Sequence, residues 1–357
     1  MKKFISLAFI LISAGFVFAQ APPPQKPLTQ AEYVRLLYDL EKNPKKRDEV
    51  VEAVRKRGIG FVMTDGIRSL TITKSRNDAE LKRTLEEASR RRENPTASQL
   101  PSEKESAEVL AKSREATLAA VDEMPDFVVK QLVSRAASYA GTNNFTNLDR
   151  LIVAASYRSN GFEEYRVLSV NGVKQTEVRG SQTYSEAGGA TTTGEFVSIL
   201  SSIFKAESNT AFQLIDTDVL RGRKALVFGF GITRDNLRRL VAVGEKLADR
   251  VETGFKGKIW IDRENFRVIR VETEATEIPA SFPLKSIKRY IDYDWTAIGS
   301  EKYLLPLVSE VRFVQKAGSE VYETRNIIRF KEYQKFGSEV KILDADEEVP
   351  EEKPNQQ

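Results

Sequence analysis

The chain has 357 residues, of which 41% are hydrophobic and 30% are charged, so it is long enough for about two domains. It contains no cysteine and no histidine, which excludes disulfides, Ser-His-Asp and Cys-His catalysis and most zinc sites. The net charge of +4 comes without a focused basic patch carrying aromatic residues, so we expect no nucleic-acid partner.

The first residues have the pattern of a secretory signal peptide. Two lysines precede an apolar run, 4–18, that is shorter than the roughly 20 residues of a transmembrane helix. Val17 and Ala19 supply the small residues of a cleavage site. We therefore predict a signal peptide at 1–19, export to the periplasm and no integral membrane span after cleavage. The Pro-rich residues 20–28 predict an extended spacer.

Residues 29–92 predict a small, basic, helical module. Thr29 is placed to cap a first helix, with Glu32 three residues later as its capping-box partner. Gly58 is placed to end a second helix, and Thr64 to begin a third.

A fourth helix is predicted at 77–92, and it ends in Arg90-Arg91-Arg92. We interpret these arginines as a solvated helix end, with the binding of an envelope partner as the alternative. Residues 93–106 are rich in Pro, Ser and Thr without apolar periodicity, which indicates a linker. A fifth helix is predicted at 105–123.

After Pro125 the period of the apolar residues changes from 3.6 to 2, which predicts about eleven short strands connected as hairpins. Asn171-Gly172 is the strongest hairpin signal among them. One nearly all-apolar helix, 195–204, interrupts the strands and follows a Gly/Ser/Thr-rich loop at 176–194. The acidic, Pro-containing residues 344–357 predict a disordered tail.

The stretch 257–272, GKIWIDRENFRVIRVE, predicts a hairpin with a polar turn. Period 2 gives it one apolar face, made of Ile259, Ile261, Ile269 and Val271. The opposite face has Trp260, Asp262, Val268 and Arg270. Asp262 and Glu264 lie where the strand turns, so we interpret them as turn residues and not as a catalytic pair.

The order of these elements, together with this hairpin, resembles the LolA-like superfamily of periplasmic lipoprotein carriers, within a subgroup of secreted bacterial proteins. The residues that match the family signature are Gly257, Trp260, Asp262, Val268, Arg270 and Glu272. The resemblance covers 107–343 and implies an α+β fold. This is a large, incompletely closed antiparallel half-barrel around one or two helices, preceded by the small helical module.

In the characterised members of this superfamily, the concave face of the half-barrel is an apolar cavity that holds acyl chains. The resemblance therefore implies a binding cavity, whose expected lining is Phe196, Ile199, Leu200, Ile203, Phe204, Phe212 and Leu214. Our first hypothesis is an exported, non-enzymatic binding protein for a lipid or an acylated protein, with no cofactor and no metal. The second is an envelope sensor that binds a protein partner through 29–92 and uses the half-barrel as a scaffold.

Three patterns point to other chemistry. Ser202 and Lys205 fit S-x-x-K, although the chain lacks the accompanying K-T-G and S-D-N motifs. Asp292 and Asp294 share a strand face and could hold a cation, but we favour a solvated face as the interpretation. Gly229-Phe230-Gly231 lacks the third glycine of a dinucleotide loop and is interpreted as strand. A histidine-free hydrolase built on the serine or the aspartates is the third hypothesis.

Overall fold

The computed structural model describes residues 26–159, 161–175, 194–237, 239–242 and 250–336. Its helices are α1 Gln30–Lys42, α2 Arg47–Arg57, α3 Asp65–Lys74, α4 Ala79–Glu93, α5 Glu103–Asp122, α6 Ser198–Phe204 and α7 Arg234–Leu237, with short 3-10 turns at Pro44–Lys46 and Ala206–Ser208. Its strands are β1 Phe127–Tyr139, β2 Thr146–Tyr157, β3 Glu163–Val170, β4 Val173–Lys174, β5 Ala211–Leu220, β6 Arg223–Ile232, β7 Arg239–Ala242, β8 Arg250–Asp262, β9 Val268–Thr276, β10 Leu284–Ile298, β11 Glu301–Ala317 and β12 Glu320–Lys335. The predicted signal peptide, spacer residues 20–25, loop residues 176–193 and the acidic tail lie outside the described residues.

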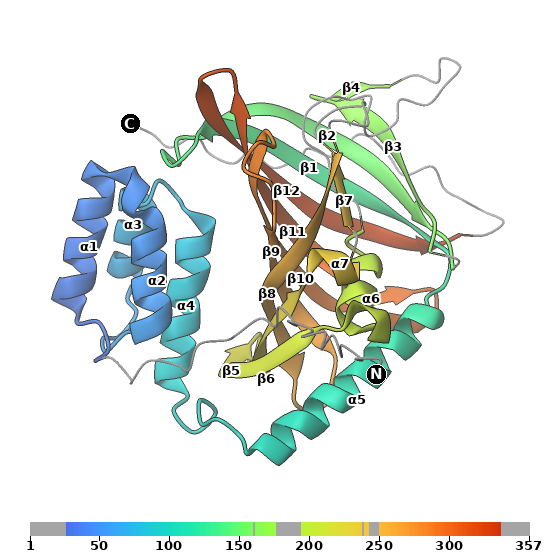
Figure 1. Ribbon diagram of the computed structural model, residues 1–357, viewed down its shortest axis with the longest axis horizontal. Coiled ribbons are helices and arrows are strands. Elements are labelled where there is room, and N and C mark those ends of the chain that lie inside the picture. The colour runs from blue at the N-terminus through green and yellow to red at the C-terminus, as the bar shows by residue number, and fades with distance from the viewer. Residues whose placement is uncertain (1–25, 160, 176–193, 238, 243–249, 337–357) are drawn as a thin grey trace, which may run out of the picture.

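The described strands form one antiparallel sheet in the order β4-β3-β2-β1-β12-β11-β10-β9-β8-β6-β5, and β7 pairs with β8 outside this path. The two edge strands do not meet, and the sheet curls around α5 and α6 (Figure 1). This arrangement confirms the predicted α+β class and the incompletely closed half-barrel. The sheet comprises twelve strands in the described residues, against about eleven predicted.

Tight turns fix the register of the hairpins. Asn171 and Gly172 between β3 and β4 both have positive φ, at 49° and 80°. Arg221 and Gly222 between β5 and β6 have φ of 50° and 76°. Two successive residues with positive φ match the right-handed twist of the flanking strands, which is why the Asn-Gly signal predicted its hairpin correctly.

The hairpin of β8 and β9 contains a β-bulge that the period-2 pattern did not reveal. Ile259 pairs with Val271 and Trp260 with Arg270, but Ile261 pairs with Val268, so Ile269 is the extra residue. Val268 therefore packs in the same apolar cluster as Ile259, and Ile269 packs against Trp260 on the other face. The predicted faces of Val268 and Ile269 are wrong, because one inserted residue reverses the alternation beyond it.

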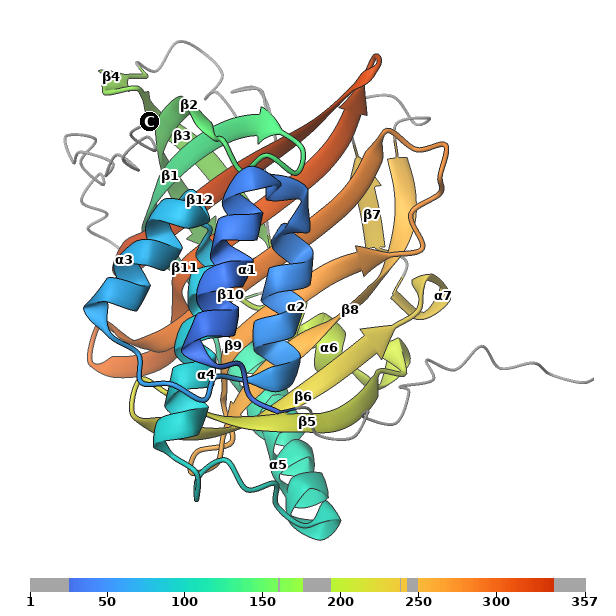
Figure 2. The same cartoon turned by 90° about the vertical axis from the view of Figure 1, so that its left-hand side faces the viewer.

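Helices α1–α4 form a compact module with its own apolar core. Thr29 and Glu32 form the predicted capping box, Gly58 ends α2 at φ 66°, and the Thr64 side chain caps α3. The shared core is built around Tyr33, Leu37, Val50, Val54, Leu81 and Leu85. Figure 2 shows the module lying across strands β8–β12, on the face of the sheet opposite α5 and α6.

The module is held to the sheet by ion pairs from the end of α4. The Arg90 guanidinium donates to both carboxylate oxygens of Asp218 at 3.0 and 3.1 Å, and Arg91 pairs with Asp216, both on β5. The interpretation of 90–92 as a solvated helix end is therefore wrong for two of its arginines, and Arg92 alone is exposed. Sequence periodicity could not reveal this, because it describes one helix and not the surface on which the helix docks.

Candidate functional site

The two faces of the sheet each carry a candidate site, and the concave face holds the predicted one. Ile199, Leu200, Ile203 and Phe204 lie in one buried cluster with the inner faces of β6, β8, β9 and β10. Phe212 and Leu214 on β5 are half-buried and pack against this cluster. The Phe204 and Phe212 rings are stacked, with their centroids 5.7 Å apart. Phe196 belongs to a neighbouring cluster.

The described residues beside α6 pack closely on the concave face. The described cavity beside α6, lined in part by Phe196, Leu200 and Val268, has a volume of about 20 Å³. This is space for about one water molecule, and far less than an acyl chain needs. The predicted lining residues on and before α6 are buried in this state, while Phe212 and Leu214 are half-buried, so an apolar ligand at this place would require α6 to move.

Helix α6 is shorter than predicted, since it begins at Ser198 and not at 195. No side chain caps its N-terminus, and it has seven residues, which is too short for a helix to be stable without packing. The Ser202 hydroxyl donates to the Ser198 carbonyl at 2.7 Å, the usual bond of a helical serine to its own backbone. Ser202 is half-buried and Lys205 is exposed, and the serine hydroxyl is bonded to the backbone of its own helix and not to the lysine.

The convex face carries charged residues in two rows that cross the strands. One row consists of Lys258, Glu272, Tyr290 and Glu310, paired in register from β8 to β11. The next row consists of Lys256, Glu274, Lys288 and Arg312. Directly opposed residues of adjacent strands lie within reach of one another, so four separate strand patterns join into one surface.

The module completes this surface with its own charges. Arg83 on α4 donates to Glu310 at 2.8 Å, and Glu310 also accepts from Arg312 at 2.8 Å. Burial raises the pKa of Glu310, but the two guanidinium groups outweigh this and lower the pKa to about 2. Burial likewise raises the pKa of Glu80 on α4, and Arg47, Lys288 and Arg55 outweigh it, again to about 2. These buried carboxylates are therefore charged at neutral pH.

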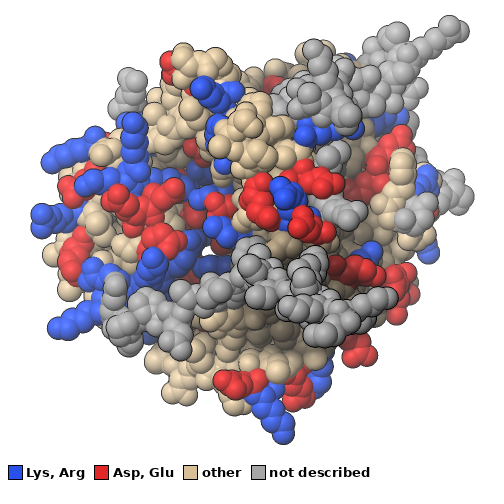
Figure 3. All heavy atoms as spheres, viewed as in Figure 1, with Lys and Arg blue, Asp and Glu red and all other residues tan. Residues whose placement is uncertain are grey.

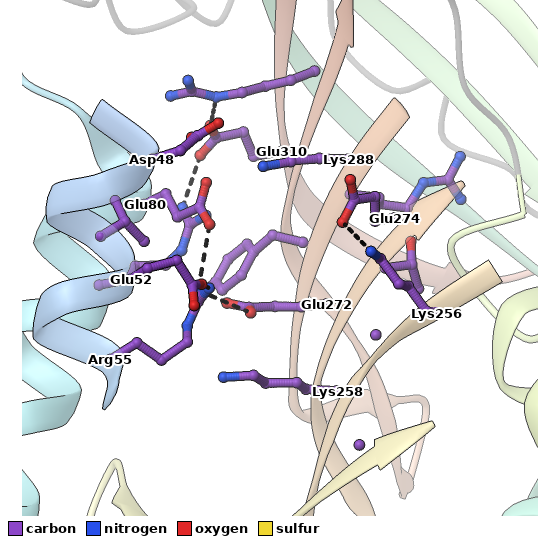
Figure 4. A pocket seen from close by; sticks show the side chains of 18 of the residues that line it. Asp48, Glu52, Arg55, Glu80, Lys256, Lys258, Glu272, Glu274, Lys288 and Glu310 are labelled. Atoms are coloured by element: carbon purple, nitrogen blue, oxygen red, sulfur yellow. Dashed lines mark hydrogen bonds and ion pairs between the residues drawn. The ribbon is translucent and has the colours of Figure 1, made fainter. Parts of the chain in front are cut away.

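A cavity of about 430 Å³ remains between the module and the sheet, and we call it the interface cavity. Helices α2 and α4 line it on one side and β6, β8, β9, β10 and β11 on the other. Figure 3 shows Lys and Arg side chains gathered around the hollow between the module and the sheet. Figure 4 shows the side chains of Lys258, Glu272 and Lys288 pointing from the sheet toward the module.

The Asp292–Asp294 pair is not a cation site in this structure. Arg270 donates to both Asp292 carboxylate oxygens, at 2.8 and 3.0 Å, and the Tyr290 hydroxyl also donates to Asp292. Asp294 accepts from the backbone N–H of Trp295. Asp292 is only 7% exposed, so the favoured interpretation of a solvated face is wrong for it. Its partner lies on another strand, and the local D-x-D pattern therefore could not show it.

The signature residues have structural contacts that explain their identities. A Cβ on Gly257 would lie 1.9 Å from the Glu272 carbonyl oxygen, so only glycine lets β8 and β9 approach this closely. Trp260 is fully buried, and its indole N–H donates to Asp218 at 3.1 Å. Asp262 accepts from the N–H of Glu264 at 2.8 Å, as expected of a turn residue, and also pairs with Arg223.

Sequence reasoning missed the interface cavity. Its signal was present as alternating charged positions in successive strands, at Lys256/Lys258, Glu272/Glu274 and Glu310/Arg312. In one strand this alternation indicates a solvated face. Only the strand register and the docked module turn it into a partly enclosed site.

No family model matches the chain, and no curated protein matches it either. An outer membrane lipoprotein-sorting protein domain from Vibrio parahaemolyticus is similar in structure, with 12% identity, a TM-score of 0.28, and coverage of 66% of this chain and 93% of that one. A DUF1329 family protein from Desulfovibrio piger has 8% identity, a TM-score of 0.28, and coverage of 66% and 95%. The MucA/MucB complex of Pseudomonas aeruginosa gives 10% identity, a TM-score of 0.17, and coverage of 62% and 94%.

At these identities and TM-scores the similarities carry no argument about ligand, partner or activity. The incompletely closed antiparallel sheet and the helices inside it are nevertheless what the resemblance to the LolA-like superfamily implies. Within the described ranges, no helix is long and apolar enough to cross a membrane, and no cluster of three or more acidic residues could hold a metal ion.

Proposed function

We propose that this chain is a non-enzymatic binding protein of the bacterial cell envelope, and that its half-barrel takes up the acyl chain of a lipid or an acylated protein. The observation that carries the proposal is the nature of the element filling the concave face. Helix α6 is an uncapped helix of seven residues, held in place by apolar side chains. Such contacts are non-directional, so an acyl chain can replace them.

Burial of the side chains around α6 and burial of an acyl chain contribute comparable free energies. Six buried apolar side chains at Phe196–Phe204 contribute roughly 13 kcal/mol, at about 1.5–3 kcal/mol each. An acyl chain of about 16 carbons contributes roughly 12 kcal/mol, at about 0.8 kcal/mol per CH₂. An acyl chain can therefore compensate for the displacement of α6, while a short apolar ligand cannot.

Uptake of a fluorescent fatty acid by the intact chain tests this proposal, with two variants that remove the same atoms. Ile199→Ala weakens the packing of α6 and leaves room beside it, so we expect greater uptake than by the wild type. Ile59→Ala is the matched control, because Ile59 is equally buried but lies in the core of the module. No uptake by the wild type and Ile199→Ala, or an equal rise in Ile59→Ala, would contradict the proposal.

Export is the second part of the proposal, and it rests on the signal-peptide pattern at 1–19. Mass spectrometry of the chain from periplasmic and cytoplasmic fractions tests it. We expect the periplasmic form to begin at Gln20. A full-length chain found only in the cytoplasm would contradict it.

Partner binding through 29–92 is a second candidate function, now restricted to the outer surface of the module. Tyr38 on α1 and Ile72 on α3 are 45% and 44% exposed, on helices that contact each other. Pull-down of envelope proteins by the intact chain tests this candidate. Loss of a partner in the Tyr38→Ala, Ile72→Ala double variant supports it, and unchanged capture argues against this surface.

A further inference from the structure

The interface cavity contains two lysines whose ammonium groups have no carboxylate oxygen within 4.0 Å among the described residues, and the proposed apolar site makes no use of them. Every carboxylate that lines the cavity has a Lys or Arg nitrogen within 4.0 Å; these are Asp48, Glu52, Glu80, Glu272, Glu274 and Glu310. Lys258 and Lys288, in contrast, form no ion pair with any residue that the structure describes. Among the cations that line the cavity, these two ammonium groups are therefore the ones left to pair with a ligand.

The two lysines line the same cavity from neighbouring rows of the sheet. Lys258 is on β8 and Lys288 on β10, with β9 between them, and both are half-buried. Both extend from the sheet toward the module (Figure 4). Partial burial of an ammonium group without a counter-charge is unfavourable. A bound anionic ligand would relieve that cost.

The module contributes two arginines, Arg55 and Arg83, to the lining of the cavity. The Nε–H groups of Arg55 and Arg83 are buried and have no hydrogen-bond partner among the described residues. An unsatisfied buried donor costs free energy, and an oxyanion can accept from several donors at once. Glu272 lies between Lys258 and Lys288 in Figure 4, and its carboxylate is 4.0 Å from the Arg55 guanidinium group. Its carboxylate can accept from a donor group on a ligand.

The size of the cavity indicates an organic ligand and not a single ion. Its volume of about 430 Å³ falls in the range of small-molecule sites, roughly 300–1,000 Å³. Val51 and the half-exposed Ile215 add apolar lining that can contact a carbon skeleton. We propose that the interface cavity binds a small organic oxyanion, a phosphate or a carboxylate, with its anionic group at Lys258 and Lys288 and a donor group at Glu272. This site is independent of the proposed acyl-chain site.

Isothermal titration of the intact chain tests the inference with three probes: phosphoethanolamine, glycerol 3-phosphate and glutarate. The first two separate an ammonium from a hydroxyl donor, and the third replaces the phosphate by carboxylates. We expect Lys258→Gln and Lys288→Gln each to weaken binding about tenfold or more, because each removes one charged hydrogen bond. Lys256→Gln is the matched control, since Lys256 is on the same strand but pairs with Glu274 at 3.5 Å.

Three possible results of the titrations decide the inference. Binding of at least one probe that is weakened by Lys258→Gln and Lys288→Gln, but changed less than twofold by Lys256→Gln, supports the inference. Absence of binding for all three probes at 10 mM overturns it. Equal weakening by all three lysine variants also overturns it, because that result indicates diffuse attraction to a basic surface.

A fourth variant tests the orientation of the ligand. Glu272→Gln removes the acceptor charge, so phosphoethanolamine should bind several-fold more weakly while glycerol 3-phosphate changes little. An equal response of the two probes contradicts the placement of the donor group at Glu272. Circular dichroism of each variant establishes that a lost signal is not a lost fold.

Discussion

Helices α5 and α6 lie on the concave face of the sheet, and α2 and α4 lie on the convex face (Figure 1). The concave face packs apolar side chains against its helices, whereas the convex face presents charged rows to its own. The described cavity beside α6 is about 20 Å³, and the interface cavity is about 430 Å³. Apolar side chains interdigitate without directional constraints, so they fill space. Ion pairs fix distances and angles between long side chains, and space remains between them.

An apolar surface and an open site are therefore separate properties of this sheet. The residues most suited by composition to line a cavity are here the residues that close it. The open space lies instead among side chains whose pattern suggested a solvated surface. Function on the concave face therefore requires movement, while function on the convex face does not.

Lowering the pH should weaken the ion pairs of the convex face but not the apolar packing of the concave face. Of the changes considered, it should reduce the free energy of unfolding most. The pKa values of Glu80 and Glu310 are lowered from about 4.5 to about 2 in the folded chain, and that of Asp78 is lowered too. Their stabilisation is present above the unfolded pKa values and is lost as the pH falls from about 4.5 toward 2.

Urea unfolding at pH 7, 4 and 3 measures this effect. We expect the free energy of unfolding to fall steeply below pH 4.5, and the Glu80→Gln, Glu310→Gln double variant to be less stable at pH 7 but less sensitive to acid. A free energy of unfolding that is constant from pH 7 to 3 would contradict the role given to the charged face.

Truncation on the concave face is the next largest effect. Phe204 is fully buried, so Phe204→Ala should lower the free energy of unfolding by about 4 kcal/mol through lost burial and a new cavity. Phe212→Ala removes the same atoms from a half-buried position and should cost about half as much. Equal losses measured by urea unfolding would show that Phe204 is not part of a tightly packed core.

Removal of one charge from the convex face should cost about 3 kcal/mol. Glu310→Gln leaves the buried guanidinium groups of Arg83 and Arg312 without their shared carboxylate. Glu274→Gln is the control, because the Glu274–Lys256 pair is exposed and should contribute less than about 1 kcal/mol. If both variants unfold at the same urea concentration, the charged rows do not bind the module to the sheet.

A smaller loss, about 2 kcal/mol, is expected for Gly257→Ala, which forces β8 and β9 apart. Gly60→Ala is the control, since its Cβ would meet ordinary contacts at 3.5 Å. Thermal unfolding of the two variants measures the difference. Equal melting temperatures would mean that the close approach of the two strands has no energetic consequence.

Local signals in the sequence predicted most of the fold. The capping box at Thr29, the Asn171-Gly172 turn and the change of period after Pro125 each depend on residues within a few positions of one another. The face of Ile269 could not be predicted, because a bulge is defined by its partner strand. The ion pair of Arg90 with Asp218 joins residues 128 positions apart, and no local pattern encodes it.

The apolar candidate site was partly predictable from the sequence, whereas the interface cavity was not. The composition of 195–204 revealed an apolar element inside the half-barrel, but not whether it lines or fills the concave face. The interface cavity depends on strand register and on the docking of α2 and α4, so its residues could be recognised only in three dimensions.

Hydrogen exchange of the intact chain, with and without a saturating C16 fatty acid, tests whether an acyl chain displaces α6 from the half-barrel. If the half-barrel takes up an acyl chain by displacing α6 while the module stays docked, amide exchange should change in Ser198–Phe204 and be unchanged in Ala79–Glu93. Unchanged exchange in α6, or a change confined to α4, would contradict the account.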